Sequence, residues 1–270
     1  LSLPAPLHSF FSFFPLHTHP SVPLSSKKQF TGPTLWIHPP KEPNSPLSAD
    51  VECLKWQAYL SLRGLHTLRV RSDVSPDGAL DARLPNLQIS EVELIAAHLI
   101  PSWVDGQLQS VDTHLEGYKD EAARDESRAW VALLEGNVHA ALLVSTPPPS
   151  YFQTLLRVRS PATDPLQSIV TPPLPPVTGF SSLLPPWGLR ISHATIQAQY
   201  RDAISALSER LGTDKWFLGS SEPTPLDALA FAYLHSILNS KDQSFRIEVT
   251  RRVNLVEWEW RVRDVVRSSF

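Results

Sequence analysis

The fold of this chain is decided by the stretch WFLGSSEPTPLDALAFAYLHSIL, residues 216–238. Within it, the Thr224 hydroxyl is placed to accept from the amide of Asp227, and the Asp227 carboxylate is placed to accept from the amide of Thr224. Pro225 falls at the first helical position, where proline fits. The run that follows is apolar on nearly every side, which is typical of a helix at the centre of a helical domain. Thr224 and Asp227 support helix capping and no other chemistry, so we interpret them as fold markers.

Further helical patterns surround this central helix. The spacing of apolar residues predicts one long helix over residues 120–144, another over 192–211 and a last one over 245–267. Leu255, Trp258, Val262 and Val265 are expected on the buried side of the last helix. Its arginines alternate with Glu and Asp, a pattern that predicts a solvated face. No strand pattern is found after about residue 110.

The residues before about position 105 alternate between strands and helices. Residues 34–37, 67–72 and 84–89 read as strands, the last led by Pro85. Asp50 is expected to cap a helix over about 51–63, and Ser90 is expected to cap a short helix that stops before Pro101. The chain therefore combines an α/β part with an all-helical part.

Proline is unusually frequent, with 26 residues, and it is clustered. We expect residues 1–30 to be an extended arm, because proline excludes a regular helix there, and residues near 160–190 to be a proline-stiffened excursion. Large apolar side chains on such segments either pack back on their own domain or bind a partner. The candidate partner-binding residues are Phe10, Phe11, Phe13, Phe14, Leu183, Leu184 and Trp187.

Composition excludes several classes of function. A net charge of −3 and a pI near 6.4 give no basic surface for nucleic acid. The one cysteine, Cys53, forms neither an internal disulfide nor a thiolate metal cluster, and we interpret it as a small buried apolar residue. His8, His17 and His19 lie on the arm without a carboxylate nearby, so no metal is expected. No apolar run is long enough for a transmembrane helix.

Several motifs resemble known families. The segment 216–219 leading into Thr-x-x-Asp resembles the capping box of the glutathione transferase fold, and Leu84-Pro85 stands where that fold keeps a cis-proline before a strand. The closer resemblance is to metaxins and covers roughly residues 31–270, with the proline-rich excursion unmatched. Three segments carry it: CLKWQAYL (53–60), TPLDALAFAYLHSIL (224–238) and VNLVEW (253–258).

This resemblance implies a thioredoxin-like domain over 31–104 and a helical domain like the C-terminal domain of glutathione transferases over 105–270, after the arm of residues 1–30. It also implies a peripheral, non-catalytic subunit of the mitochondrial sorting and assembly machinery, on the cytosolic face of the outer membrane. The expected partners are the membrane-embedded β-barrel subunit, a second metaxin-like subunit and β-barrel precursors with their β-signal.

Two other functions stay open: a glutathione-using enzyme of the same fold, and an assembly module of a soluble complex. Glutathione enzymes activate a thiolate with Tyr, Ser or Cys just after the first strand. Here that place holds His38-Pro39-Pro40, followed by Ser45 and Ser48. The acidic-Ser pair that grips glutathione occurs only in reverse order, as Ser90-Glu91. We therefore expect no catalytic residue, cofactor or metal.

Overall fold

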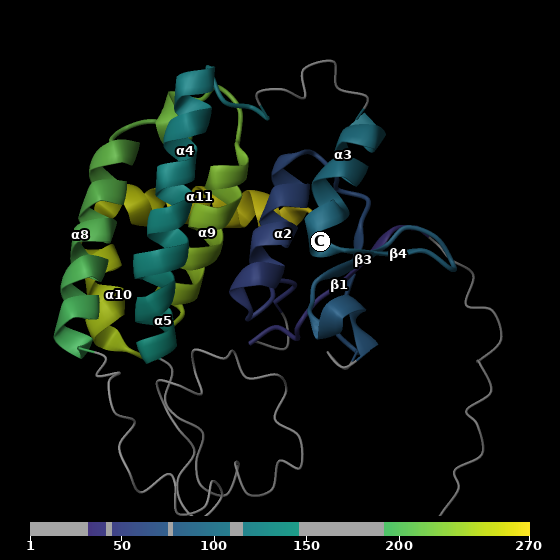
Figure 1. Ribbon diagram of the computed structural model, residues 1–270, viewed down its shortest axis with the longest axis horizontal. Helices are drawn as coiled ribbons and strands as arrows, with labels where there is room; N and C mark the ends of the chain where they lie inside the picture. The colour runs from purple at the N-terminus through teal and green to yellow at the C-terminus, as the bar shows by residue number, and fades with distance from the viewer. Residues whose placement is uncertain (1–31, 42–44, 75–77, 109–115, 146–191) are drawn as a thin grey trace, which may run out of the picture. The chain divides into compact units, whose positions relative to one another are not determined.

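The computed structural model describes residues 32–41, 45–74, 78–108, 116–145 and 192–270. A four-stranded sheet and its helices come first, and a group of helices follows (Figure 1). The first part contains β1 (Thr34–Trp36), α2 (Val51–Leu62), β2 (Arg69–Arg71), the 3₁₀ turn η2 (Leu80–Ala82), β3 (Asn86–Gln88), β4 (Leu94–Ala96), the 3₁₀ turn η3 (Ala97–Leu99) and α3 (Ile100–Leu108).

The sheet has the strand order β2-β1-β3-β4, with β1 parallel to β2 and the other neighbouring pairs antiparallel. Because side chains alternate along a strand, the register divides the residues between two faces. Leu35 and Leu87 lie opposite each other and are fully buried. Trp36 lies opposite Asn86, on the other face. In the described part of the connection from β2 to β3, the helical element is the 3₁₀ turn η2, which contacts β4.

The helical part contains α4 (Glu121–Leu133), the π turn η4 (Leu134–Val138), α5 (His139–Ser145), α8 (His193–Leu211), the 3₁₀ turn η6 (Phe217–Gly219), α9 (Pro225–Leu238), α10 (Gln243–Thr250) and α11 (Val253–Ser268). In Figure 1, α2 lies between the strands and this group of helices. Helix α9 packs on α2, α10 and α11, and nearly all its side chains are buried. This confirms the prediction of a central helix that is apolar on every side.

Both fold markers are confirmed. The peptide bond between Leu84 and Pro85 is cis. Thr224 and Asp227 form a capping box at the start of α9, with Pro225 in its first turn. The predicted cap Asp50 also accepts the expected backbone amide, that of Cys53, and Ser192 caps α8 by accepting the amide of Thr195.

Two predicted elements are wrong in detail. The helix expected after Ser90 is instead strand β4, and α3 begins only at Ile100. Pro101 therefore sits in the first turn of α3, where no intrahelical hydrogen bond is lost. The single helix over 245–267 is two helices, α10 and α11, which break at Arg251 and Arg252. The long helix predicted over 120–144 is confirmed as the continuous run of α4, η4 and α5, with a π turn in its middle.

One predicted core position on α11 is wrong. Leu255, Trp258 and Val262 are buried as expected. Val265 is 39% exposed, and Val266 is buried in its place. Among the described helices, none is both long and apolar enough to cross a membrane.

Candidate partner-binding groove

The position after β1, where transferases of this fold activate a thiol, is closed by hydrogen bonds. The amide of His38 donates to Sγ of Cys53 at 3.4 Å, and Oγ of Ser48 donates to the carbonyl oxygen of His38 at 2.9 Å. Cys53 is fully buried, and this burial raises the pKa of its thiol well above the ordinary value, with the nearby Asp50 adding to the shift. A buried thiol with a raised pKa is a poor nucleophile.

A cavity of about 600 Å³ borders the first turn of α2 and side chains from α5 and α9. Its acidic groups are already engaged: Asp50 caps α2, and Glu52 pairs with Lys55 at 2.7 Å. Tyr233 lines the cavity from α9, and its hydroxyl lies 3.3 Å from Nδ1 of His139. Burial raises the pKa of Tyr233, so its phenol stays protonated and is not available as a base that deprotonates a thiol.

The reversed pair Ser90-Glu91 has a local structural role. Oγ of Ser90 accepts the amide of Glu93 at 3.1 Å in the turn between β3 and β4. Glu91 is exposed and lines a different cavity, which lies beside Trp36 and the connection between β2 and β3. The pair therefore shapes a turn and the edge of that cavity.

We define this second cavity as the sheet groove. It has a volume of about 390 Å³. Trp36 is fixed on the sheet, since Nε1 of its indole donates to Oε1 of Gln88 at 3.2 Å and the guanidinium of Arg71 lies 4.5 Å from the ring centroid. The groove is lined by Trp36, Val74, Gly78, Ala79, Leu84, Asn86, Gln88, Glu91, Val92, Glu93 and Leu94.

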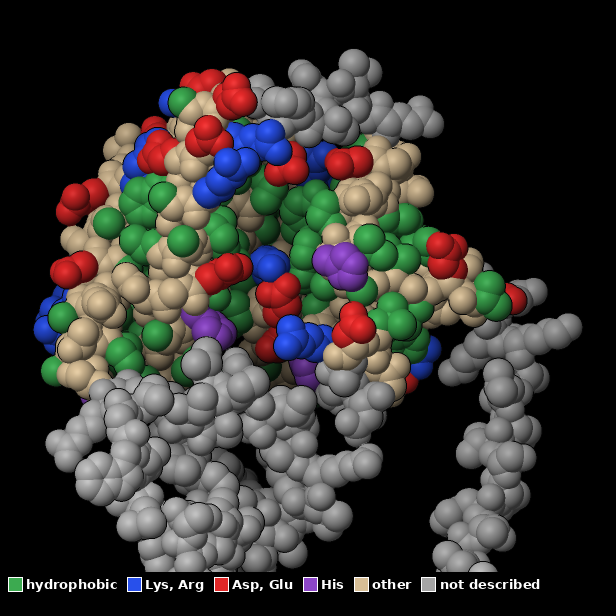
Figure 2. Space-filling view, in the orientation of Figure 1, with side chains coloured by type: hydrophobic (Ala, Val, Ile, Leu, Met, Phe, Trp, Pro, Cys, Tyr) green, Lys and Arg blue, Asp and Glu red, His purple; other side chains and the backbone are tan. Residues whose placement is uncertain are grey.

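Strand β4 lies at an edge of the sheet, directly beside the sheet groove. Its surroundings expose apolar side chains: Val92 is 96% exposed, Leu94 36% and Leu80 38%. The opposite edge strand, β2, instead exposes Arg69 and Arg71, and charged residues at an edge discourage strand addition. Figure 2 shows hydrophobic side chains at the surface over the region that Figure 1 assigns to β3 and β4. Strand β4 itself carries no charged residue, while Glu91 and Glu93 are exposed in the turn before it.

Sequence patterns alone missed this groove. The alternation Glu91-Val92-Glu93-Leu94 has the period of a strand and was the available signal. It is too short to outweigh the spacing of Leu94, Ile95 and Leu99, which also fits a helix. The partner-binding residues predicted from the sequence, Phe10, Phe11, Phe13, Phe14, Leu183, Leu184 and Trp187, all lie outside the described residues.

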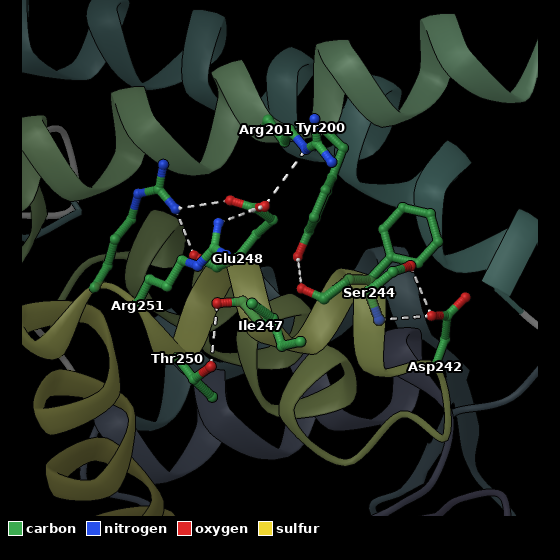
Figure 3. A network of polar contacts seen from close by, with 10 residues as sticks. Tyr200, Arg201, Asp242, Ser244, Ile247, Glu248, Thr250 and Arg251 are labelled. Carbon is green, nitrogen blue, oxygen red and sulfur yellow. Dashed lines mark hydrogen bonds and ion pairs between the residues drawn. The ribbon is translucent and has the colours of Figure 1, made fainter.

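The arginines near the break between α10 and α11 form a network around Glu248. Figure 3 shows this carboxylate facing guanidinium groups from α8 and from the end of α10. Nε of Arg201 lies 3.4 Å from Oε1, Nη1 of Arg251 lies 3.3 Å from the same oxygen, and Nη1 of Arg252 lies 3.5 Å from Oε2. The network ties α8 to α10, in agreement with a structural role for these charges.

Within the described ranges, no group of three or more His, Cys, Asp or Glu side chains is placed to hold a metal ion. His8, His17 and His19 lie outside those ranges.

Comparison with known proteins places the fold. Residues 200–262 match the family model described as glutathione S-transferase, C-terminal domain. Glutathione transferase Omega 3C from Trametes versicolor is similar in structure, with a TM-score of 0.51 and 9% identity over 88% of this chain and 84% of that one. A glutathione transferase from Populus trichocarpa gives a TM-score of 0.49 and 10% identity, over 88% of this chain and 99% of that one.

A glutathione S-transferase from Rhodospirillum rubrum gives a TM-score of 0.48 and 14% identity, over 84% of this chain and 86% of that one. No curated protein sequence matches the chain. At such identities the likeness concerns the fold alone. The chain thus has a glutathione-transferase-like fold, a small mixed sheet followed by helices, and residues 200–262 match the glutathione S-transferase C-terminal domain family.

Proposed function

We propose that this chain is a non-catalytic, metaxin-type subunit of the mitochondrial sorting and assembly machinery, which binds β-barrel precursors on the cytosolic side of the outer membrane. The sequence resemblance in residues 53–60, 224–238 and 253–258 suggests this role. The observation that carries the proposal is structural: β4 is an edge strand without charged residues, and it lies beside the sheet groove.

An edge strand offers unpaired backbone amides and carbonyls to an incoming extended segment. At β4 the neighbouring groove adds a place for side chains, because a bound strand directs every second side chain to the same face. Trp36, Leu84 and Leu94 give that place an apolar lining. A β-barrel precursor supplies the matching pattern, since its strands alternate apolar and polar residues.

The closed position after β1 supports a binding role over the enzymatic alternative. A glutathione-using enzyme needs an activated hydroxyl or thiol there. His38 and Ser48 are instead engaged with each other, and Cys53 is buried with a raised pKa. Retention on glutathione resin together with turnover of chlorodinitrobenzene would replace our proposal with the enzymatic one.

The direct test is affinity purification of the tagged full chain from solubilised mitochondria. We expect an outer-membrane β-barrel subunit, a second metaxin-like subunit and precursor in the eluate. We also expect the chain to sediment with mitochondria and to be released by carbonate. An eluate without any outer-membrane barrel protein, and a chain that stays in the soluble fraction, would favour the assembly module of a soluble complex.

A further inference from the structure

A further cavity, of about 360 Å³, lies away from the sheet groove, between the segment after β1 and the ends of α9 and α11. Polar and cationic side chains make up most of its lining, and among its described lining residues there is no Asp or Glu. The lining consists of Lys41, Ser45, Leu47, Ser48, Ala49, His235, Ser236, Asn239, Arg263 and Arg267. We refer to it as the cationic cavity.

Three cations line the cationic cavity, Lys41 from the segment after β1 and two arginines from α11, and two of the three have no carboxylate partner in the described part of the chain. Among the described residues, no Asp or Glu lies within ion-pair distance of Lys41 or Arg267. Nζ of Lys41 donates to the carbonyl oxygen of Asn239 at the end of α9. An ammonium has three protons, so two remain for a ligand.

Arg263 is the third cation, and it is only loosely paired. Its Nη1 lies 3.8 Å from Oε2 of Glu259, beyond hydrogen-bond distance. Glu259 is fully buried, and its other oxygen, Oε1, forms a hydrogen bond of 2.7 Å with Nδ1 of His235. The arginine therefore keeps donors available, while the carboxylate lies behind the cavity wall.

The charge balance indicates the ligand. Three cations against the one carboxylate of Glu259 leave two positive charges (3 − 1 = 2). In the neighbouring 600 Å³ cavity, Glu52 pairs with Lys55, and Asp50 keeps its negative charge while it caps α2, so Asp50 offsets at most one of these two charges. A phosphomonoester carries between one and two negative charges near neutral pH and accepts several hydrogen bonds.

We propose that the cationic cavity binds a phosphomonoester group. Arg263 and Arg267 are four residues apart on α11, so their side chains leave neighbouring turns of the same helix face. Guanidinium groups hold phosphate oxygens in pairs of hydrogen bonds, and Lys41 adds a point charge from the segment after β1. The group belongs either to a soluble organic phosphate or to a lipid headgroup such as that of phosphatidic acid.

The test uses the full chain and three probes: glycerol 3-phosphate, vesicles of phosphatidylcholine with phosphatidic acid, and acetate as a carboxylate. Calorimetry and vesicle flotation measure binding at 0.15 M salt. We expect the doubly substituted variant Lys41→Gln/Arg267→Gln to bind phosphate at least about tenfold more weakly, because two charge-assisted contacts are lost. Binding to glycerol 3-phosphate identifies a soluble ligand, and binding to the vesicles alone identifies a lipid.

The control variant is Arg261→Gln, which removes the same charge from the same helix but lies outside the cavity lining. We expect its affinity to stay within about twofold of the unsubstituted chain. Circular dichroism checks that each variant is folded, and the single variants Lys41→Gln and Arg267→Gln give the same test should the double one unfold. The proposal is wrong if neither phosphate probe binds, if acetate binds as tightly, or if Arg261→Gln weakens binding as much as the double variant. It does not depend on the role of the sheet groove.

Discussion

Thr224 and Asp227 hold each other at the start of α9. Oγ1 of Thr224 donates to Oδ2 of Asp227 at 2.6 Å, and the amide of Thr224 donates to the same oxygen at 2.8 Å. The other oxygen of Asp227 accepts the amide of Phe217 at 2.9 Å. One buried carboxylate thus joins the cap of α9 to the preceding turn η6, which explains why the segment 216–227 marks the fold so clearly.

This carboxylate predicts a pH dependence of stability. Burial raises the pKa of Asp227 to about 6, although hydrogen bonds from Thr224 and Phe217 oppose the shift. The folded pKa lies above the unfolded value, so the folded state takes up the proton first as the pH falls. As the pH falls from about 7 to about 4, the free energy of unfolding should therefore rise, and this group should contribute at most about 3 kcal/mol to the rise.

The variant Asp227→Asn isolates this contribution. It should remove the rise, and it should lose about 1–3 kcal/mol at neutral pH, because an amide nitrogen replaces an acceptor oxygen. Urea unfolding of both proteins at several pH values measures the difference between them. Parallel curves for the two proteins would show that Asp227 does not titrate in this range.

A substitution at Gly117 should also change stability, because this glycine lies next to the cap of α9. Its φ is +94°, and an added Cβ would lie 2.9 Å from the carbonyl oxygen of Pro223, just before the cap. Gly117→Ala should therefore destabilise the protein by more than about 1 kcal/mol, through backbone strain and the close contact. Thermal or urea unfolding measures the loss.

Gly106 provides the matched control. It lies within α3, and an added Cβ would meet no atom within 4 Å. Gly106→Ala should stabilise the protein by about 0.5–1 kcal/mol, because alanine favours the helix. Equal effects of the two substitutions would contradict the steric argument.

The elements that were predicted best from the sequence are those that local chemistry determines. Helix α9 has a cap, a first-turn proline and a continuous apolar run, so both its type and its bounds were evident. Strands β1 and β3 were found because apolar residues and prolines mark their ends. The break at Arg251 and Arg252 was missed because apolar spacing continues across it, and contacts of Glu248 with Arg201 on α8 stabilise the break from outside.

The candidate groove was less predictable for a similar reason. It exists because the connection between β2 and β3 contains only η2 in its described part, and because β4 is a strand. The second feature depends on pairing with β3, which lies several residues away in sequence and stabilises β4 only in the folded sheet.

Cys53 gives a direct chemical prediction, since it is the one cysteine of the chain. Burial raises the pKa of its thiol, and Sγ accepts the amide of His38. A thiol reagent at pH 8 should therefore label the folded protein far more slowly than the protein in denaturant. Quantitative labelling of the folded protein within the time needed for the denatured one would show that the thiol is accessible, and it would revive the enzymatic alternative.

Substitutions of two exposed valines, one beside the sheet groove and one far from it in sequence, test whether the groove binds a partner. Val92 is 96% exposed beside β4, and Val253 is 64% exposed at the start of α11. Neither Val92→Arg nor Val253→Arg should change the free energy of unfolding by more than about 0.5 kcal/mol, because both side chains lie at the surface.

Only Val92→Arg should weaken binding of an extended precursor segment, because it places a charge where apolar side chains of an added strand would lie. Fluorescence anisotropy with a labelled peptide from a β-barrel strand measures the affinity, and we expect a loss of about tenfold for Val92→Arg. A peptide with its apolar residues shifted by one position controls for pattern, since its apolar side chains would point away from the groove. Equal binding by both variants would mean that the precursor binds elsewhere on the molecule.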